Sequence, residues 1–415
     1  MRIWILNHYA SPPDRPAGTR HYEFGRLLAG WGHDVTIFAS SFSHFSRAEE
    51  RLAAGERMRA EVIDGVRFVW IRTTPYSRND HRRVLNMLSY AAGAVQAQRT
   101  FARPDVVIGS CVHPMAVAAA CLIGAIRRAP FVFEVRDLWP QTLIDMGALR
   151  ERGVTARVLR ALERFLYHRA RLVISLLPGA AEYITAAGVP ASKIVYIPNG
   201  IAERTAVPAW PDAQTRVLVD RIRQWREAGC LVAGYVGSHG QANGADMLVE
   251  AAAVLRDRGI GDIALVLVGD GPDKERCEQL ARRRGLQNIL FAPPVPKHAV
   301  PSVLEALEVT LFPLRDVPVF RYGLSSNKLF DYLASGRPVI FACALADNPV
   351  RASGGGICVR PEAPTAVADA LVQLAAAGQA GRRAIGEQGR SWVYRHHNVT
   401  TLAEQFLRAL TGTLK

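Results

Sequence analysis

The chain contains the stretch Phe320-Arg-Tyr-Gly-Leu-Ser-Ser-Asn-Lys-Leu-Phe-Asp-Tyr-Leu-Ala-Ser-Gly-Arg-Pro-Val-Ile340, which predicts a loop, a short helix and a strand. Ser325 and Ser326 are residue types that cap a helix N-terminus, and Gly336 is a typical stop signal. Between them the apolar residues recur at helical spacing, and an apolar strand begins at Pro338. This order of elements is typical of one unit of a parallel α/β sheet.

The start of this predicted helix is a candidate anion site. A first helical turn presents unpaired backbone N–H groups and the positive end of the helix dipole. Lys328, beside Asn327, falls in that turn, where a cation opposes the dipole, and a bound diphosphate would account for its presence. Asp331, one turn on, could accept hydrogen bonds from a vicinal diol such as ribose. The same residues also allow a solvated lysine and aspartate on an ordinary surface helix.

The stretch resembles the C-terminal nucleotide-sugar motif of retaining GT-B glycosyltransferases of the family 4 type. That motif usually holds two glutamates with seven residues between them. Asp331 falls on the second glutamate and Gly323 on the first, so the second carboxylate is kept and the first is lost. The form from Asn327 to Val339 is similar to a bacterial O-antigen, capsule and exopolysaccharide subgroup, the fucosaminyltransferase-like proteins. The resemblance implies two Rossmann-like parallel-sheet domains that face a central cleft, with Ser325 to Lys328 and Asp331 binding the donor.

Length and charge restrict the possible functions. At 415 residues the chain exceeds one typical core, so we expect two domains. A net charge of +14 favours an anionic partner such as a nucleotide diphosphate, nucleic acid or an acidic membrane surface. The sequence contains no Lys/Arg-rich run of the kind that forms a nucleic-acid-binding arm. The six cysteines form no C-x-x-C pair, which predicts reduced thiols in a cytoplasmic protein and no metal or disulfide framework.

The alternation of apolar runs and helical patterns predicts the domain boundaries. We expect an acceptor-side domain over residues 1–202 and a nucleotide-sugar domain over residues 203–389. By the resemblance, a C-terminal helix from about residue 390 to 415 crosses back onto the first domain. Residues 41–60 are polar and without periodicity, which predicts a mobile, irregular excursion. The longest apolar run, residues 115–126, is too short to span a bilayer, so any membrane association must be peripheral.

The first half carries two groups of candidate acceptor-side residues. Gly18, Thr19 and Arg20 follow the first strand, where Gly18 permits a close backbone approach and Arg20 offers charge to a phosphate. Arg82 and Arg83 precede an amphipathic helix. That helix either lies on an anionic membrane or covers the core beneath a solvated basic cap.

Two further loops of the first half contain candidate catalytic residues. His113 ends a predicted strand and is either a cleft residue or a structural histidine. Glu134, Arg136 and Asp137 lie on an apolar strand, as a buried Glu–Arg pair or as lining of a site. Glu-Val-Arg-Asp-Leu-Trp-Pro140 resembles the same subgroup, in which a histidine often occupies the position of Arg136. The resemblance makes Asp137 the candidate for orienting or deprotonating the acceptor hydroxyl, with Arg136 binding phosphate or holding Asp137.

The second half offers loops that could hold a nucleotide. Gly237, Ser238, Gly240 and Asn243 lie in a Gly-rich loop whose backbone N–H groups could cradle phosphate. In the family this loop usually supplies an Arg and a Lys, whose positions hold Ser238 and Asn243 here. The charge therefore passes to Lys328, Arg321 or the first domain. Gly269 and Asp270 resemble the family's Gly-x-Gly turn beside the nucleotide, although Asp270 is equally consistent with a plain tight turn. Arg321 would border the donor sugar and phosphate.

The resemblance thus implies a retaining glycosyltransferase, and because no DxD or similar metal-binding motif stands out, we expect it to be metal-independent. It would move a UDP-linked HexNAc or deoxy-aminosugar to a polyprenyl-diphosphate-linked sugar in cell-surface polysaccharide synthesis. The expected location is cytoplasmic, peripheral on the inner face of the plasma membrane, with no nucleic-acid partner. Two rivals stay open. One is an isomerase like the non-hydrolysing UDP-sugar 2-epimerases, and the other is a catalytically silent nucleotide-sugar binding protein.

Overall fold

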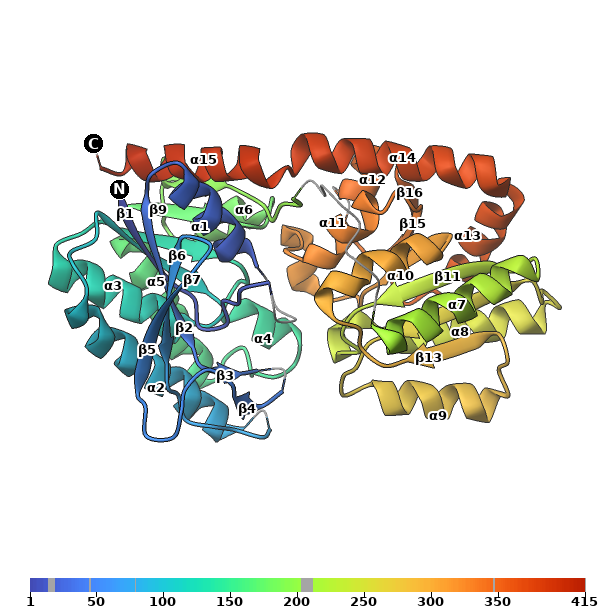
Figure 1. Cartoon of the computed structure of the whole chain (residues 1–415), viewed down its shortest axis with the longest axis horizontal. Helices are drawn as coiled ribbons and strands as arrows, with labels where there is room; N and C mark the ends of the chain where they lie inside the picture. The colour runs from blue at the N-terminus through green and yellow to red at the C-terminus, as the bar shows by residue number, and fades with distance from the viewer. Residues whose placement is uncertain (14–18, 45, 79, 203–211, 346–347, 415) are drawn as a thin grey trace. The chain divides into compact units, whose positions relative to one another are not determined.

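The computed structural model describes residues 1–13, 19–44, 46–78, 80–202, 212–345 and 348–414. The described chain divides into two compact units. Unit 1 comprises described residues within 1–202, 322–325 and 399–415, and unit 2 comprises those within 203–321 and 326–398 (Figure 1). The chain enters unit 2 after residue 202, where the sequence places the boundary, but it returns at Val399 instead of near residue 390.

Among the described residues, unit 1 contains an eight-stranded sheet in the order β10-β9-β8-β7-β1-β2-β6-β5. Its strands are β1 (Arg2–Leu6), β2 (Asp34–Ser40), β5 (Met58–Ile63), β6 (Val66–Ile71), β7 (Val106–Cys111), β8 (Phe131–Val135), β9 (Leu172–Ser175) and β10 (Ile194–Tyr196). All neighbouring pairs are parallel except β5 with β6, which are antiparallel. Six of the strands give the buried, β-branched runs that parallel sheets require.

The excursion predicted over residues 41–60 is wrong in part. Strand β3 (Phe42–Ser43) pairs with β4 (Ala48–Glu49), and β5 extends the main sheet as an antiparallel edge strand. The residues of β5 alternate only between half-buried and exposed. An edge strand without a buried face gives no apolar periodicity, which is why the pattern escapes sequence analysis.

The helices of unit 1 are α1 (Arg20–Gly30), α2 (His81–Ala97), α3 (Pro114–Arg127), α4 (Gln141–Asp145), α5 (Val154–Arg169), α6 (Ala180–Ala186) and α15 (Val399–Gly412), with short 3-10 turns at Gln98–Thr100 and Ala191–Lys193. The C-terminal helix α15 packs on α1, where the rings of Phe24 and Phe406 lie 5.3 Å apart (Figure 1). Both rings belong to the core of unit 1, so the last helix is an integral part of this unit.

Unit 2 contains, among the described residues, a six-stranded parallel sheet in the order β13-β12-β11-β14-β15-β16. Its strands are β11 (Leu231–Val236), β12 (Ile263–Val268), β13 (Ile289–Ala292), β14 (Val309–Pro313), β15 (Val339–Ala342) and β16 (Gly356–Val359). This is the 3-2-1-4-5-6 order of a doubly wound Rossmann sheet, in which ligands bind where the order reverses. The reversal lies between β11 and β14.

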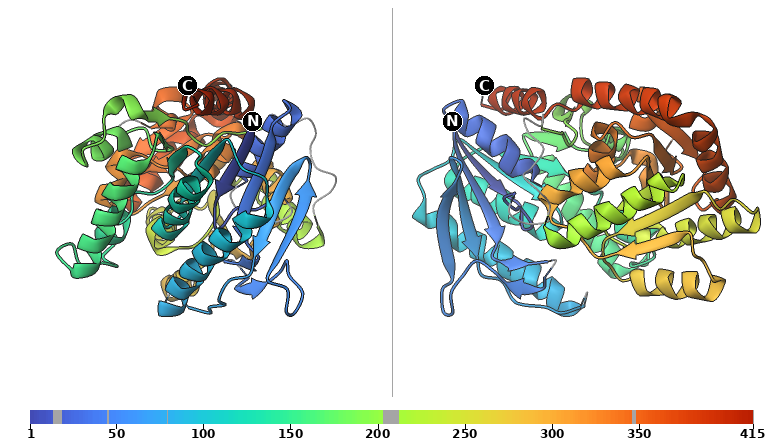
Figure 2. Two further views of the ribbon diagram at one scale, coloured as in Figure 1. Left: turned by 90° about the vertical axis from the view of Figure 1, so that its left-hand side faces the viewer. Right: turned by 45° about the vertical axis from the view of Figure 1, so that its right-hand side comes forward.

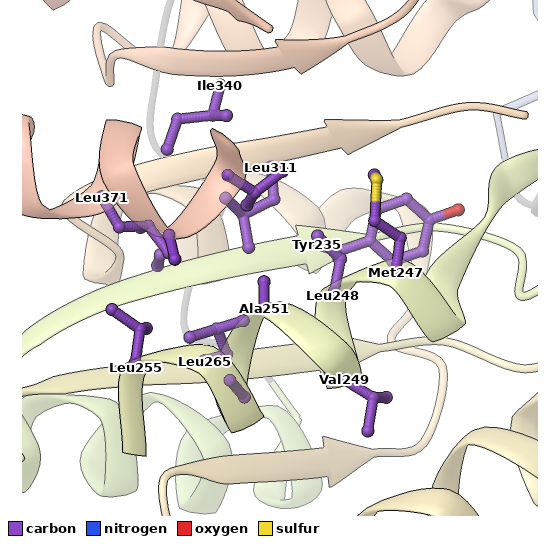
Figure 3. Packing of buried hydrophobic residues seen from close by; sticks show 14 of the residues in the cluster. Tyr235, Met247, Leu248, Val249, Ala251, Leu255, Leu265, Leu311, Ile340 and Leu371 are labelled. Carbon is purple, nitrogen blue, oxygen red and sulfur yellow. The ribbon is translucent and has the colours of Figure 1, made fainter. Parts of the chain in front are cut away.

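The helices of unit 2 are α7 (Ala213–Glu227), α8 (Ala245–Asp257), α9 (Lys274–Arg284), α10 (Val300–Ala306), α11 (Asn327–Ala334), α12 (Pro349–Ser353), α13 (Pro364–Ala376) and α14 (Gly378–His396), with 3-10 turns at Gln241–Asn243, Lys297–Ala299 and Pro318–Tyr322. Figure 3 shows Leu248, Ala251 and Leu255 of α8 pointing toward the strands that carry Tyr235 and Leu265. This packing fixes α8, and with it the loop that precedes it. Together the two sheets confirm the predicted α/β architecture of two Rossmann-like domains.

No helix in the described part of the chain is long and apolar enough to cross a membrane. The six cysteines form no disulfide with one another, and Cys111, Cys277 and Cys343 are buried.

Candidate active site

Lys328, in the first turn of α11, reaches the end of β11 at the reversal point of the unit 2 sheet. Its Nζ lies 2.9 Å from the hydroxyl oxygen of Tyr235 and 2.8 Å from Oδ1 of Asn243. The ammonium also lies 4.8 Å from the centre of the Tyr235 ring. It stands close to the Gly-rich loop, since a Cβ on Gly237 would lie 3.1 Å from Nζ. Two of the three ammonium N–H bonds are used, and the third is left for a ligand.

The charge of Lys328 has no carboxylate partner within ion-pair distance among the described residues. Burial lowers the pKa of its ammonium to about 7, although part of the side chain stays accessible. A desolvated cation without a counter-ion is costly in a folded protein unless a ligand supplies the negative charge. This environment distinguishes Lys328 from the solvated surface lysine that the sequence also allowed.

The loops after β11 and β12 touch through their backbones. Gly269 has φ +144°, and a Cβ there would lie 1.9 Å from the carbonyl oxygen of Gly237. The N–H of His239 donates to the carbonyl of Asp270 at 2.8 Å, and the carboxylate of Asp270 accepts from the N–H of Gly271 at 2.8 Å. The close contact between the two loops therefore requires glycine at position 269. Asp270 stabilises the turn through its own carboxylate, as in the plain tight turn that the sequence also allowed.

His239 is a feature of this loop that sequence analysis missed. The residue is completely buried, and neither ring nitrogen has a hydrogen-bond partner among the described residues. Burial lowers the pKa of the His239 ring to about 4, so the ring is neutral. Gly240 follows it and leads into the turn that carries Asn243, while Ser238 offers its carbonyl oxygen to the Tyr235 hydroxyl at 2.5 Å.

Tyr332 fastens α11 to the same strand end. Its hydroxyl accepts from the N–H of Val236 at 2.7 Å and donates to the carbonyl of Val236 at 2.9 Å. The predicted cap is only partly realised, because Ser326 is the N-cap residue but its side chain makes no capping hydrogen bond. A second serine nearby, Ser325, lies in unit 1, where its carbonyl accepts from Asn199 Nδ2 at 2.6 Å. The backbone N–H groups of the first turn are thus not covered by a side-chain cap.

Three more of the predicted donor residues lie on α11 or directly before it. Asn327 and Asp331 are half-buried on α11, and Arg321 is exposed at the end of the preceding 3-10 turn. Arg315, which the sequence did not single out, is bound by the carboxylate of Asp246 at 2.6 Å and of Glu362 at 2.9 Å. It braces the Gly-rich loop, because its backbone N–H donates to the carbonyl of Ala242 at 3.0 Å.

Gly323 shows why the first motif glutamate is missing. It has φ +112°, and a Cβ would lie 2.3 Å from Cδ of Pro178, in the same unit. The adjacent carbonyl of Tyr322 accepts from the N–H of Gly179 at 2.9 Å, which holds the two segments together. No side chain fits at this position, so a carboxylate cannot occupy it in this backbone conformation.

We expect Gly323→Ala to destabilise unit 1 by about 3 kcal/mol, from left-handed backbone strain plus the overlap with Pro178. Gly147→Ala is the matched control, because Gly147 has φ +73° but nothing within 4 Å of its Cβ position. That substitution should cost about 1 kcal/mol, the strain alone. Denaturant unfolding of unit 1 followed by hydrogen exchange measures both values. Equal costs at the two glycines would show that Pro178 yields and that the position tolerates a side chain.

Arg20 has a structural role in place of the predicted phosphate contact. The guanidinium is buried, donates from Nε to Oε1 of Glu134 at 2.9 Å, and also donates to the carbonyls of Ile197 and Pro198. Oε2 of Glu134 lies 2.7 Å from Nε2 of His21. Glu134 thus forms the buried Glu–Arg pair of the structural alternative, with Arg20 instead of Arg136 as its partner. Thr19 is buried beside it, and Gly18 lies outside the described residues.

His113 also has a structural role. It is completely buried, and its Nδ1 accepts from the N–H of Ala116 at 3.3 Å as the N-cap of α3. Its Nε2 lies 2.6 Å from Nδ1 of His8. Burial lowers the pKa of His113 to about 3, and the positive charge of Arg83 acts in the same direction. With both nitrogens occupied and the ring neutral, His113 has no position left for a substrate.

The remaining acceptor-side candidates lie at the surface of unit 1. Asp137 is exposed directly after β8, and Arg136 beside it is half-buried. Arg82 is exposed in the first turn of α2, while Arg83 is half-buried near His113. Of the first-half candidates that the structure describes, these four have side chains that are not fully buried.

Comparison with known families gives the two units separate matches. Residues 17–200 match the glycosyl transferase 4-like domain, and residues 230–377 match the glycosyl transferases group 1 domain. The chain is a GT-B glycosyltransferase. In this order, the glycosyl transferase 4-like domain comes first, and the group 1 domain carries the Lys328 site.

Relatives of this glycosyltransferase cover almost its full length. It is 25% identical over 389 residues to the "Putative colanic acid biosynthesis glycosyl transferase WcaI" of Escherichia coli K12, covering 90% of this chain and 92% of that protein. Its fold is similar to sucrose-phosphate synthase from Thermosynechococcus elongatus (TM-score 0.73, 19% identity, 99% and 98% coverage). It is also similar to HepE of Anabaena, solved in complex with UDP (TM-score 0.66, 15% identity, 99% and 100% coverage).

In this glycosyltransferase four of the predicted donor residues lie close together. Gly237, Ser238, Asn243 and Lys328 are brought together at the end of β11. Sequence analysis missed Tyr235 and Tyr332, which position Lys328 and α11. Their signal was weak, because a tyrosine in an apolar strand or helix is typical of an ordinary core position.

Proposed function

We propose that this glycosyltransferase is a retaining, metal-independent enzyme that uses a UDP-linked HexNAc or deoxy-aminosugar. The acceptor in this proposal is a sugar linked to polyprenyl diphosphate, and the product enters cell-surface polysaccharide. The single observation that carries the donor part is the partly desolvated ammonium of Lys328, which has no counter-ion among the described residues and lies beside the Gly-rich loop.

The chemistry of the leaving group supports the assignment of Lys328. Transfer from a nucleotide diphosphate sugar increases the negative charge on the diphosphate, and catalysis needs positive groups already in place there. The ammonium, the uncapped N–H groups of α11 and the amides of the Gly-rich loop can supply that charge without a metal ion. Asp331 would then hold the ribose diol, and Arg321 would border the donor sugar.

The nature of donor and acceptor is supported by what relatives are named for. HepE has been solved with UDP and with UDP-glucose, and WcaI is named for colanic acid biosynthesis. On unit 1, Asp137 is the proposed base for the acceptor hydroxyl, with Arg136 beside it. The exposed position of Asp137 is compatible with that contact, in contrast to the buried His113.

A donor panel tests the proposal. The purified protein is incubated with UDP- and GDP-sugars, with and without a polyprenyl-diphosphate-linked sugar, and the released nucleotide is measured. We expect acceptor-dependent release of UDP that persists in EDTA, and a product that keeps the anomeric configuration of the donor. Conversion of UDP-GlcNAc to an epimer without acceptor would indicate the isomerase. Donor binding without transfer to any acceptor would indicate a silent binding protein.

A further inference from the structure

Three helices of unit 1 form one outward-facing layer. Helix α3 packs between α2 and α5, and the left view of Figure 2 shows the blue-to-green helices of this unit side by side. Their solvent-facing side chains are called the outer face of unit 1 below. This face differs in composition from an ordinary solvated surface.

Large apolar side chains are exposed on all three helices. On α2 they are Val84, Leu85 and Leu88, and on α3 they are Leu122 and Ile126, each about half exposed. Single exposed apolar residues are normal on a protein surface. A group of them on adjacent helices marks an interaction surface.

Helix α5 carries the most exposed stripe. Val154, Val158 and Phe165 are 69%, 60% and 55% exposed. Together with Ala161 they follow the i, i+4, i+7, i+11 spacing that places side chains on one line of a helix. Arg157 and Arg164 stand beside this line and are exposed. An apolar line bordered by arginines is the pattern of a helix that lies in a membrane interface.

The outer face contains no exposed carboxylate on these helices. Neither α2 nor α3 contains an Asp or a Glu. The acidic residue of α5, Glu163, is buried and accepts hydrogen bonds from the hydroxyls of Tyr167 and Tyr183, both at 3.0 Å. The cationic side chains of this face therefore have no acidic partner on the same helices, and Arg160 of α5 is paired with Glu151, which precedes the helix, at 3.4 Å.

A basic hollow of about 510 Å³ adjoins the C-terminal ends of α3 and α5. Its lining includes His168, Arg169, Arg171 and Lys193 and no carboxylate side chain among the described residues. A hollow of this charge suits the phosphate of a lipid head group.

The helices of unit 2 provide a contrast within the same chain. Among the described residues of that unit, the exposed large apolar side chains are Val217 and Val372, which lie on separate helices. Several of its surface arginines are paired with acids, as in Arg284 with Glu250 at 2.9 Å. Among the described residues, the combination of grouped apolar side chains with basic residues thus distinguishes the outer face of unit 1 from the helices of unit 2.

We propose that the outer face of unit 1 docks on the surface of an anionic lipid bilayer. Exposed apolar side chains insert at the head-group boundary, and arginines bind the lipid phosphates. A second copy of the chain fits less well, because a symmetric contact would place arginine against arginine. The proposal deepens the proposed function, in which the acceptor is lipid-linked, but its observations lie outside the donor site.

Vesicle flotation tests the docking surface. We expect the protein to bind phosphatidylcholine vesicles that contain phosphatidylglycerol, to bind pure phosphatidylcholine vesicles weakly, and to dissociate as salt is added. The double variant Val158→Ser with Phe165→Ser should lower the affinity for the anionic vesicles about tenfold, because it removes apolar contacts. Val217→Ser with Val372→Ser, on exposed positions of unit 2, is the matched control and should bind as the unchanged protein does.

The possible failures can be told apart. Absence of vesicle binding by the unchanged protein, or equal binding by both double variants, would overturn the docking proposal. Concentration-dependent dimerisation that only the α5 variant abolishes would identify a second copy as the occupant and would also overturn it. Calorimetric binding of UDP should be the same in all variants, since none is at the donor site. If the proposed function were wrong, calorimetry would detect no UDP binding by a protein that still binds vesicles.

Discussion

Lys328→Ala should weaken UDP binding by at least about 1.5 kcal/mol, which is roughly a tenfold rise in Kd. The ammonium lies beside the Gly-rich loop without a carboxylate partner among the described residues, and it keeps one N–H bond for a ligand. Isothermal titration calorimetry measures the effect. Arg223→Ala removes one positive charge from an exposed position of the same unit and should leave the affinity unchanged. Equal UDP affinity in both variants would remove Lys328 from the site.

Proton linkage gives a second signature of the same contact. Burial lowers the pKa of Lys328 to about 7, so the amine is mostly neutral at about pH 8 in the free protein. A bound diphosphate favours the charged form and raises that pKa, so UDP binding should take up close to one proton at that pH. The uptake should vanish below about pH 6, where the lysine is already charged. Titration in buffers of different ionisation enthalpy measures it, and Lys328→Ala should abolish it.

Glu134→Gln should destabilise unit 1 by about 3–5 kcal/mol, the cost of leaving a buried charge without its partner. Arg20 is 5% exposed, and its Nε bond to Glu134 is the charge contact that compensates its burial. Asn7 Nδ2 donates to Nδ1 of His21 at 2.8 Å, so that ring is neutral and donates to the carboxylate. Asp369→Asn, which breaks the exposed pair with Arg258, is the control and should cost less than about 1 kcal/mol.

Two further measurements test the origin of this effect. In a double-mutant cycle, the loss of stability in Glu134→Gln with Arg20→Met should be smaller than the sum of the losses in the two single variants, because no unpaired charge remains.

The pH dependence of stability is the second measurement. Burial opposes ionisation of Glu134, but His21 and Arg20 beside it outweigh that effect and hold its pKa well below the usual range. The contribution is therefore full above the unfolded-state pKa of about 4.3 and is lost as pH falls below it. If the Glu134→Gln variant were destabilised by the same amount at every pH, the ion-pair explanation would be contradicted.

The sequence predicts the two α/β sheets because their strands are buried on both faces and give uninterrupted apolar runs. Strand β5 escaped because an exposed edge strand has no such run. The C-terminal boundary of the second domain, predicted near residue 390, lies at Val399 for a related reason. Helix α14 and helix α15 are both amphipathic, and the return to unit 1 at Val399 depends on which core each apolar stripe meets.

The candidate site was predictable where residue type implies chemistry. Lys328 at a helix start and glycines after β11 indicate anion binding whatever the rest of the chain does. Arg20 and His113 stand at the starts of helices that follow strands β1 and β7, as a site residue would, but their partners Glu134 and His8 lie more than 100 residues away in sequence. Hydrogen bonds between segments that are distant in sequence decide the role of these two side chains, and no local sequence pattern predicts such contacts. The same holds for Gly323, whose lack of a side chain is imposed by Pro178.

A crystal structure of the protein with UDP tests the central claim most directly. We predict a diphosphate oxygen within hydrogen-bond distance of Lys328 Nζ, in front of the first turn of α11, with the ribose hydroxyls at Asp331. A nucleotide that occupies any other part of unit 2, or that leaves Lys328 bound only to Tyr235 and Asn243, would contradict the account.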